Sequence, residues 1–240
     1  MIRISRIRRY PIKGLAGEDL DNLTLTAGGG VPLDRRYALA LPDRLLGLAE
    51  DASLARFSAA AAEDGRLVLY RDSVPVAAGR ADRHDGMAEL ELVLNRHLGE
   101  IANPRIVPVE GGDAAEETKP ISLISLASLE ALAPLLDAVP DPRRFRANLY
   151  LEGLSAWQEL QWPGAELKIG TAWLRVTEPT ARCKMINVNP ERAVADVNIP
   201  KAMVKALGHA LCGVYAEVLA SGSIALGDTV ELIAVGNTGV

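Results

Sequence analysis

Short runs in which hydrophobic and polar residues alternate recur along the chain, and this alternation predicts β-strands. The clearest example is 165–179, where apolar positions alternate on both sides of Gly170, as expected of a hairpin. The other predicted strands, bounded by glycine, proline or aspartate, cover residues 19–26, 37–41, 66–70, 104–109, 145–153 and two or three segments within 212–234. Many short strands joined by glycine turns are typical of a barrel or a sandwich.

Three segments instead show the apolar spacing of helices. Residues 86–99 place five apolar side chains on one stripe and end at a glycine. Residues 125–136 predict a second helix with Ser125 or Ser128 as its N-cap, although a proline near its end predicts an early stop or a kink. A short helix is predicted at 200–208, with a proline at its start and a glycine at its end.

Two segments fit neither pattern clearly. Residues 52–63 are ambiguous between helix and strand. Residues 110–120 are polar and contain glycine, so we expect a linker or a mobile loop there. Predicted strands outnumber predicted helices along the whole chain. The pattern therefore predicts a mainly β protein with α+β elements.

The composition narrows the classes of protein to which the chain can belong. Its 240 residues, 49% of them hydrophobic, suffice for one large domain or two intimate ones with a sizeable core. A net charge of −5 and an aromatic content of 4% argue against nucleic-acid or anionic-membrane binding. No apolar run reaches the roughly 18 residues of a membrane span, and the basic N-terminus lacks the apolar stretch of a secretory signal. We therefore expect a cytoplasmic protein with no nucleic-acid and no membrane partner.

Cysteine is scarce in this chain. Cys183 and Cys212 are too few for a disulfide framework, and the three histidines are too scattered for a zinc cluster. Cys183 lies in the turn-rich stretch EPTARCKMINVNP, between Arg182 and Lys184. It is either an inert buried thiol or, because the flanking cations favour the thiolate, a nucleophile or metal ligand. Cys212 has apolar neighbours, and we expect it to be structural.

Basic residues in two N-terminal motifs are candidates for anion binding. Lys13 in YPIKG is either an exposed lysine beside a turn or an ammonium that reaches a phosphate from a permissive glycine backbone. Arg35 and Arg36 in PLDRRYAL precede a predicted strand, so that one of the two can face a given site. They are either a surface pair or a source of one guanidinium for a phosphate or carboxylate.

A third basic cluster lies in DPRRFRANLYLEG. Arg144 and Arg146 fall on one face of the predicted strand 145–153, and Asn148 continues that face. This polar row is either a solvated sheet face or the lining of a polar barrel mouth. No hydrolase or nucleotide-binding motif accompanies the basic clusters, which leaves those classes of function without support.

The order of these motifs resembles that of the MOSC family, which is named after the C-terminal domain of molybdenum cofactor sulfurases. The motifs that carry the resemblance cover nearly the whole chain: YPIKG, PLDRRYAL, SLISLASLEAL, RFRANLYLEG, PTARCKM and CGVYAEVLASGSIALGDTVEL. The resemblance implies a MOSC-type β-barrel over residues 101–236. It also implies a preceding N-terminal MOSC-type β-rich domain over residues 1–100, and a few short helices.

The resemblance further implies the molybdenum cofactor (molybdopterin), a pterin dithiolene that carries a phosphate. Cys183 matches the cysteine that binds the metal, and a soft thiolate suits a soft, sulfur-coordinated metal. Pyridoxal phosphate is connected with the chain only through the family name and is not expected to bind. The residues implied to contact the cofactor are Lys13, Arg35, Arg36, Ser125, Arg144, Arg146, Asn148 and Arg182.

Two positions depart from the family's pattern. Gly14 stands where relatives usually have serine after the YPIK lysine, which removes a hydroxyl donor. Ala147 stands in the middle of the motif that reads Arg-Pro-Asn in relatives. Neither change removes the expected metal ligand.

The activity implied by the resemblance is that of a molybdenum-dependent oxidoreductase that reduces N-hydroxylated compounds. Its electrons would come from a separate donor, a ferredoxin- or flavoprotein-type protein, and Cys183 would be both catalytic residue and metal ligand. Two alternatives stay open: a sulfur transferase that carries a persulfide on Cys183, and a non-catalytic carrier of the cofactor. All three need the same pocket and thiolate, so the sequence does not separate them.

Overall fold

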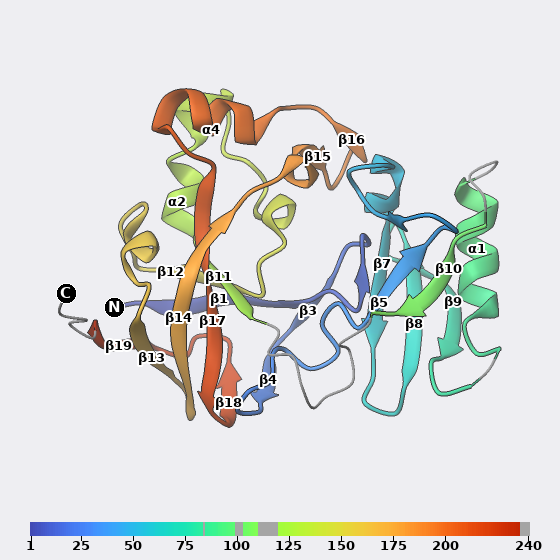
Figure 1. The fold of residues 1–240 in the computed structure, drawn as a ribbon, viewed down its shortest axis with the longest axis horizontal. Coiled ribbons are helices and arrows are strands. Elements are labelled where there is room, and N and C mark those ends of the chain that lie inside the picture. The colour runs from blue at the N-terminus through green and yellow to red at the C-terminus, as the bar shows by residue number, and fades with distance from the viewer. Residues whose placement is uncertain (84, 99–102, 110–119, 236–240) are drawn as a thin grey trace.

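The chain folds into two neighbouring β-rich lobes in a computed structural model that describes residues 1–83, 85–98, 103–109 and 120–235. Most elements are strands, and the helices are short (Figure 1). The predicted linker lies outside the described residues apart from Pro120. None of the helices in the described part of the chain has the length and apolarity that a membrane crossing requires.

An eight-stranded sheet forms the larger lobe. Neighbouring strands are antiparallel except β11 and β12, which run parallel. In spatial order the strands are β19 (Val230–Val235), β13 (Ala165–Ile169), β14 (Ala172–Ala181), β17 (Leu211–Ala220), β11 (Ile121–Ser125), β12 (Leu149–Glu152), β1 (Arg3–Arg9) and β3 (Glu18–Leu20). The hairpin predicted at 165–179 is confirmed as β13 and β14.

The sheet curls until β1 meets the chain at the start of β19. Ile4 N donates to Asp228 O at 3.0 Å, and Val230 N donates to Ile2 O at 2.9 Å. These bonds satisfy backbone groups that an open sheet would leave at its edges. The predicted fold class, a mainly β protein with a barrel, is therefore confirmed.

Alternating side chains fill the barrel. In β13, Ala165, Leu167 and Ile169 are fully buried, whereas the residues between them point outward. Burying one such leucine or isoleucine stabilises the fold by roughly 1.5–3 kcal/mol. The alternation of apolar residues in the sequence thus reflects which side chains point into the interior of the barrel.

The second lobe has its own apolar core. Helix α1 (Ala88–Leu98), predicted at 86–99, lies along one side of this lobe (Figure 1). The remaining elements of the lobe are β2 (Ile12–Lys13), β5 (Tyr37–Ala40), β6 (Leu45–Leu46), η1 (Ala52–Arg56), β7 (Phe57–Ala61), β8 (Arg66–Arg71), β9 (Val74–Arg80) and β10 (Arg105–Pro108). The ambiguous segment 52–63 is therefore a 3-10 turn followed by a strand.

The first strands of the chain belong to the barrel lobe. Strands β1 and β3 extend the large sheet, and β4 (Asn22–Leu25) pairs with β18 (Gly222–Ala225). Strand β2 of the second lobe therefore lies, along the sequence, between strands that belong to the barrel lobe. The division into domains at residue 100 stays a prediction.

Short helices cover one end of the barrel, where α2 and α4 lie together in Figure 1. The single helix predicted at 125–136 is two helices, α2 (Leu126–Glu130) and α3 (Ala133–Leu136), because the proline starts a new one. Helix α4 (Ile199–Leu207) confirms the prediction at 200–208. Short elements complete this end: η2 (Pro142–Phe145), η3 (Gln158–Gln161), η4 (Lys184–Asn187), β15 (Val188–Asn189) and β16 (Val194–Ala195).

Two predicted strands differ from the structure. The segment 145–153 is a strand only over β12, because η2 precedes it and Arg146 has a positive φ of 52°. Arg144, Arg146 and Asn148 therefore do not form a row on one strand face, and that prediction was wrong. The segment 19–26 is divided into β3 and β4.

Candidate functional site

A cavity of about 560 Å³ lies between the two lobes. Arg8, Tyr10 and Arg146 line it from the barrel lobe, and Phe57 lines it from the second lobe. Met185, two residues after Cys183, also lines the cavity. Acidic side chains, among them Glu18 and Glu191, also line it, so the cavity combines basic, acidic, aromatic and apolar walls. It adjoins the segment that carries Cys183.

Three arginines from distant parts of the sequence form the feature that we call the arginine cluster: Arg35, Arg146 and Arg182. The ring of Tyr10 links two of them, because its centroid is 5.0 Å from the guanidinium carbon of Arg35 and 4.4 Å from that of Arg146. Arg35 Nη2 also donates to the carbonyl of Arg146 at 2.9 Å. Cation–π contacts and this hydrogen bond hold the two side chains together.

Arg182 enters the cluster from the chain directly after β14. Its Nε donates to Cys212 O at 2.7 Å and its Nη1 donates to Phe145 O at 2.9 Å. Its Nη2 is buried and has no hydrogen-bond partner among the described residues. Gly213, with φ of 79°, makes room for this group, since a Cβ there would lie 2.8 Å from Nη2.

The electrostatics of the cluster are unbalanced. Burial opposes the charge of Arg35, but Asp34 outweighs it and raises the Arg35 pKa. Burial lowers the pKa of Arg146 to about 10, and burial also lowers the pKa of Arg182. Within the described chain, no carboxylate forms an ion pair with Arg146 or Arg182. A buried charge needs a partner, so an anion bound here would supply what the protein does not.

Cys183 is exposed and forms the N-cap of η4. The two cations beside it in sequence are engaged elsewhere: Arg182 bonds to backbone carbonyls, and Lys184 Nζ lies 3.8 Å from Glu50 Oε1. Cys212 is buried, which raises the pKa of its thiol to about 12. Of the two thiols, Cys183 is thus the one available to a ligand.

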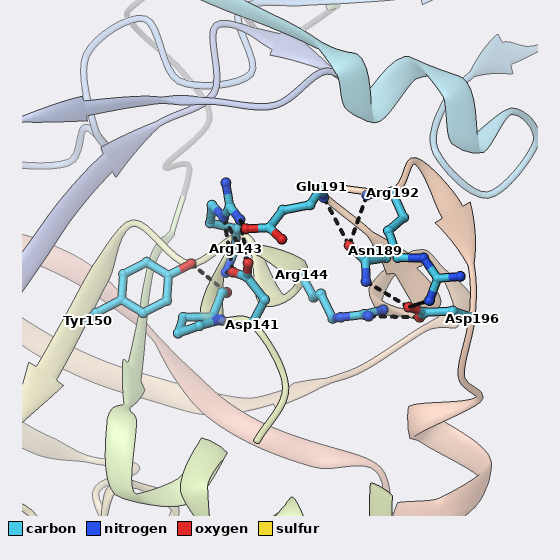
Figure 2. A network of polar contacts seen from close by, with 9 residues as sticks. Asp141, Arg143, Arg144, Tyr150, Asn189, Glu191, Arg192 and Asp196 are labelled. Atoms are coloured by element: carbon cyan, nitrogen blue, oxygen red, sulfur yellow. Dashed lines mark hydrogen bonds and ion pairs between the residues drawn. The ribbon is translucent and has the colours of Figure 1, made fainter. Parts of the chain in front are cut away.

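Two residues predicted to bind the cofactor make structural contacts instead. Arg144 donates to Asn187 O at 2.8 Å. It also donates to Asp196 Oδ1 at 2.7 Å, a contact that Figure 2 shows. Asn148 accepts from Ser122 Oγ at 2.8 Å and donates to Arg8 O at 3.2 Å. Their polar atoms fix the loop that presents Arg146.

Ser125 ends β11 and is fully buried, but its hydroxyl does not cap α2. Its backbone N–H donates to Glu159 Oε1 at 3.3 Å, and the Ser128 hydroxyl donates to Glu159 Oε2 at 2.8 Å. Glu159 therefore accepts from the backbone N–H of the N-cap residue, as the glutamate of a capping box does, although it comes from another part of the chain. The buried Ser125 hydroxyl has no hydrogen-bond partner among the described residues.

The other two predicted residues lie beside the second lobe's sheet. Lys13 is exposed on β2, and Arg36 is half-buried just before β5. Gly14 has a φ of 96°, and a Cβ there would lie 3.0 Å from both Gly47 Cα and Leu46 O. The positive φ and the close packing on the neighbouring backbone therefore account for glycine at this position.

Of the predicted site residues, the structure brings Arg35, Arg146 and Arg182 together. Sequence reasoning missed Tyr10 and Glu159. Tyr10 stands in the YPIKG motif, so its motif was the available signal. Glu159 lies in a segment without helical or strand periodicity, and nothing in the sequence marked it as buried.

The chain is similar to known protein domains and to a solved structure. The sequence model of the MOSC N-terminal beta barrel domain matches residues 1–98, and that of the MOSC domain matches residues 95–231. The YUAD protein from Bacillus subtilis has a similar fold, with a TM-score of 0.51 and 15% identity, covering 96% of this chain and 94% of that one. At this identity the likeness concerns the fold alone.

Two curated proteins are similar in sequence. Mitochondrial amidoxime reducing component 2 of Bos taurus is 29% identical over 131 residues, and that of Rattus norvegicus is 30% identical over 131 residues. Each match covers 49% of this chain and 38% of the relative. This chain therefore aligns with well under half the length of those relatives. Since the two domain models together account for residues 1–231, the chain belongs to the MOSC family.

Proposed function

We propose that this protein is an oxidoreductase that binds the molybdenum cofactor and reduces N-hydroxylated compounds. The observation that carries the proposal is the arginine cluster. The buried Arg146 and the buried Nη2 of half-buried Arg182 have no carboxylate partner among the described residues, and Arg182 directly precedes exposed Cys183 in the chain. The similarity to proteins named amidoxime reducing component supports the choice of substrate. An amidoxime carries an N-hydroxyl group.

The residues present fit this cofactor. Its phosphate is an anion, and the buried Nη2 of Arg182 together with the Arg146 guanidinium would hold it. The Ser125 hydroxyl, which has no partner among the described residues, would offer a further hydrogen-bond donor. Cys183 would bind the metal as a thiolate.

The chemistry balances only with an external donor. Reduction of an N-hydroxyl group to the amine breaks the N–O bond, consumes two electrons and two protons, and releases water. When bound, the cofactor supplies the metal centre at which the oxygen atom leaves the substrate. The protein holds the cofactor through the arginine cluster, and a separate ferredoxin- or flavoprotein-type protein supplies the electrons.

Turnover with a small-molecule donor tests this function. The protein would be purified from a host that makes the cofactor, and oxidation of reduced methyl viologen would be followed with and without an aryl amidoxime. We expect amidoxime-dependent oxidation that Cys183→Ala abolishes and Cys212→Ala retains. The second variant is the matched control because it removes the buried thiol, which lies outside the reaction.

Other outcomes would favour the two alternative functions. Cofactor bound without turnover of any N-hydroxylated compound would identify a carrier. Cyanolysable sulfur on Cys183 after incubation with a cysteine desulfurase, with no bound pterin, would identify a sulfur transferase. Its exposed position makes Cys183 accessible to a protein that donates sulfur.

We also propose a cytoplasmic location for the protein.

A further inference from the structure

Helix α4 has a buried apolar side and an exposed basic side. Ile199 and Met203 are fully buried in the core at this end of the barrel. Lys201, Val204 and Lys205 follow the spacing i, i+3 and i+4, so they share one face, and all three are exposed. Val204 retains 52% of its accessible surface, and Leu207, three residues further along the helix, retains 38%.

The charge of this face contrasts with that of the protein. Residues 197–216 contain Lys201 and Lys205 but no aspartate or glutamate, although the whole chain has a net charge of −5. In the part of the chain that the structure describes, neither lysine forms an ion pair. The two ammonium groups therefore add positive charge to this face without an ion-pair partner among the described residues.

The face is tied to the segment that carries Cys183. Element η4 starts directly after Cys183, contacts α4, and holds its first residue, because Ile199 N donates to Asn187 Oδ1 at 3.0 Å. Met203 lies in the same core as Phe145. The Phe145 carbonyl in turn accepts a hydrogen bond from the arginine cluster. Figure 1 shows α4 at the end of the barrel reached by β14, the strand that leads to Cys183.

We propose that the face formed by Lys201, Val204, Lys205 and Leu207, which we call the α4 face, docks an acidic electron-carrier protein. This inference rests on the proposed function, which needs two electrons from outside. The described residues include no cluster of metal-binding side chains that would hold an electron-transfer centre of the chain's own. Charge complementarity steers such a carrier, and the exposed aliphatic side chains give it a dry contact.

A protein fits this face better than a membrane surface does. A helix that lies in a membrane interface is rich in lysine and arginine and presents a broad apolar face with aromatic or leucine side chains. Helix α4 has nine residues, and its apolar side is already occupied by the core. Two lysines and two partly exposed aliphatic residues instead form a small patch suited to a transient complex.

The test compares two charge-reversed proteins. Lys201→Glu/Lys205→Glu removes the positive field of the α4 face. Arg66→Glu/Lys168→Glu changes the net charge equally but lies on β8 and β13, away from α4 (Figure 1). The probes are an acidic [2Fe–2S] ferredoxin and an acidic flavodoxin, each in its reduced form for turnover and its oxidised form for calorimetric binding.

We expect at least one probe to bind wild type, with an affinity that falls as salt rises. The α4 variant should bind the carrier about tenfold more weakly, and its KM for the reduced carrier should rise about tenfold. The viologen-driven rate of each protein serves as the reference for activity that does not depend on docking. The control variant should change both by less than twofold. Equal losses in both variants, or binding of neither carrier to wild type, would overturn the proposal.

Two further outcomes are informative. Co-sedimentation of wild type with phosphatidylserine vesicles that the α4 variant loses would assign the face to a membrane and also overturn the proposal. Absence of viologen-driven turnover would overturn the proposed function instead. The calorimetric binding of oxidised carrier needs no turnover, so it would still decide whether the α4 face docks an acidic protein.

Discussion

Arg182 is held in place by backbone atoms, which leaves its charge free for a ligand. The carbonyls of Cys212 and Phe145 accept two of its N–H groups and fix the plane of the guanidinium. Neither carbonyl carries a full negative charge, so burial still lowers the pKa of Arg182. Positioning and charge compensation are thus separated in this residue, as anion recognition requires.

Replacing Arg182 should therefore weaken cofactor retention. In Arg182→Met the anion loses a charge-assisted donor, and we expect at least a tenfold lower pterin content, measured by fluorescence of the oxidised pterin. Arg182→Lys should recover only part of it, because an ammonium cannot reproduce the planar fork. Arg175→Met, on the outside of the barrel, is the control and should retain wild-type content. Full retention in Arg182→Met would refute this role.

Gly213 offers a matched test of the space around Arg182. Gly213 and Gly208 both have φ of 79°, but a Cβ on Gly213 would lie 2.6 Å from Leu123 O, whereas nothing lies within 4 Å of one on Gly208. Gly208→Ala should cost about 1 kcal/mol for the left-handed backbone alone. Gly213→Ala should cost about 2 kcal/mol more, because backbone or Arg182 must move. Urea unfolding measures both, and equal losses would contradict the crowding.

Among the elements, α2 depends on a carboxyl group from η3. Glu159 is fully buried and accepts hydrogen bonds from Ser125 N and the Ser128 hydroxyl. Burial raises its pKa above the ordinary value of 4.5, and the hydrogen bonds oppose this rise. The folded protein therefore holds the Glu159 proton more tightly than the unfolded chain does.

The raised pKa of Glu159 determines how its contribution to the free energy of unfolding changes with pH. The contribution of Glu159 is fully present below pH 4.5 and is lost as pH rises through its folded pKa. Glu159→Gln stays neutral, so the difference in free energy of unfolding should shift in favour of the variant as pH increases. Urea denaturation from pH 4 to pH 8 checks this. A difference that stays constant, or shifts toward wild type, would contradict the assignment.

An ion pair between Arg144 and Asp196 connects the loop that presents Arg146 to the residue directly after β16. Its pH dependence is opposite to that of Glu159. Burial opposes the charge of Asp196, but hydrogen bonds from Asn189 and Arg144 outweigh it and lower the Asp196 pKa. Its stabilisation is therefore present above pH 3.8 and is lost as pH falls through the folded pKa.

Asp196→Asn should destabilise the protein at neutral pH by about 1–3 kcal/mol, because it leaves the buried Arg144 guanidinium without its carboxylate. Glu191→Gln is the matched control in the same network (Figure 2). It removes an exposed carboxylate that pairs with Arg143, so it should cost less than 1 kcal/mol. Thermal or urea unfolding compares the two variants. Similar losses would argue against the structural role of Arg144.

At the scale of the whole molecule, the sequence predicted the parts that repeat and missed those that depend on distant contacts. Alternation in β13 and β14 is visible because every second side chain enters the barrel. The backbone of Arg146 was not predictable, because its left-handed conformation is supported by a hydrogen bond from Arg35, over a hundred residues earlier. The cavity likewise joins residues from Arg8 to Glu191.

The motifs did predict the arginines of the site, although they did not predict which arginine has which role. Arg35, Arg146 and Arg182 were expected to contact a cofactor, and they meet around Tyr10 and Phe145. The structure distinguishes them from Arg144, which is neutralised by Asp196. Spacing along a chain does not reveal which arginine finds a carboxylate in the fold.

The central claim is that this chain holds one molybdenum cofactor, anchored by the arginine cluster and bound through Cys183. Its most direct test is elemental analysis of the protein purified from a cell that makes the cofactor, with pterin measured in the same sample. We predict about one molybdenum and one pterin per chain in wild type, and pterin with little or no molybdenum in Cys183→Ala. A wild-type protein without molybdenum, or a Cys183→Ala protein with the same molybdenum content as wild type, would contradict it.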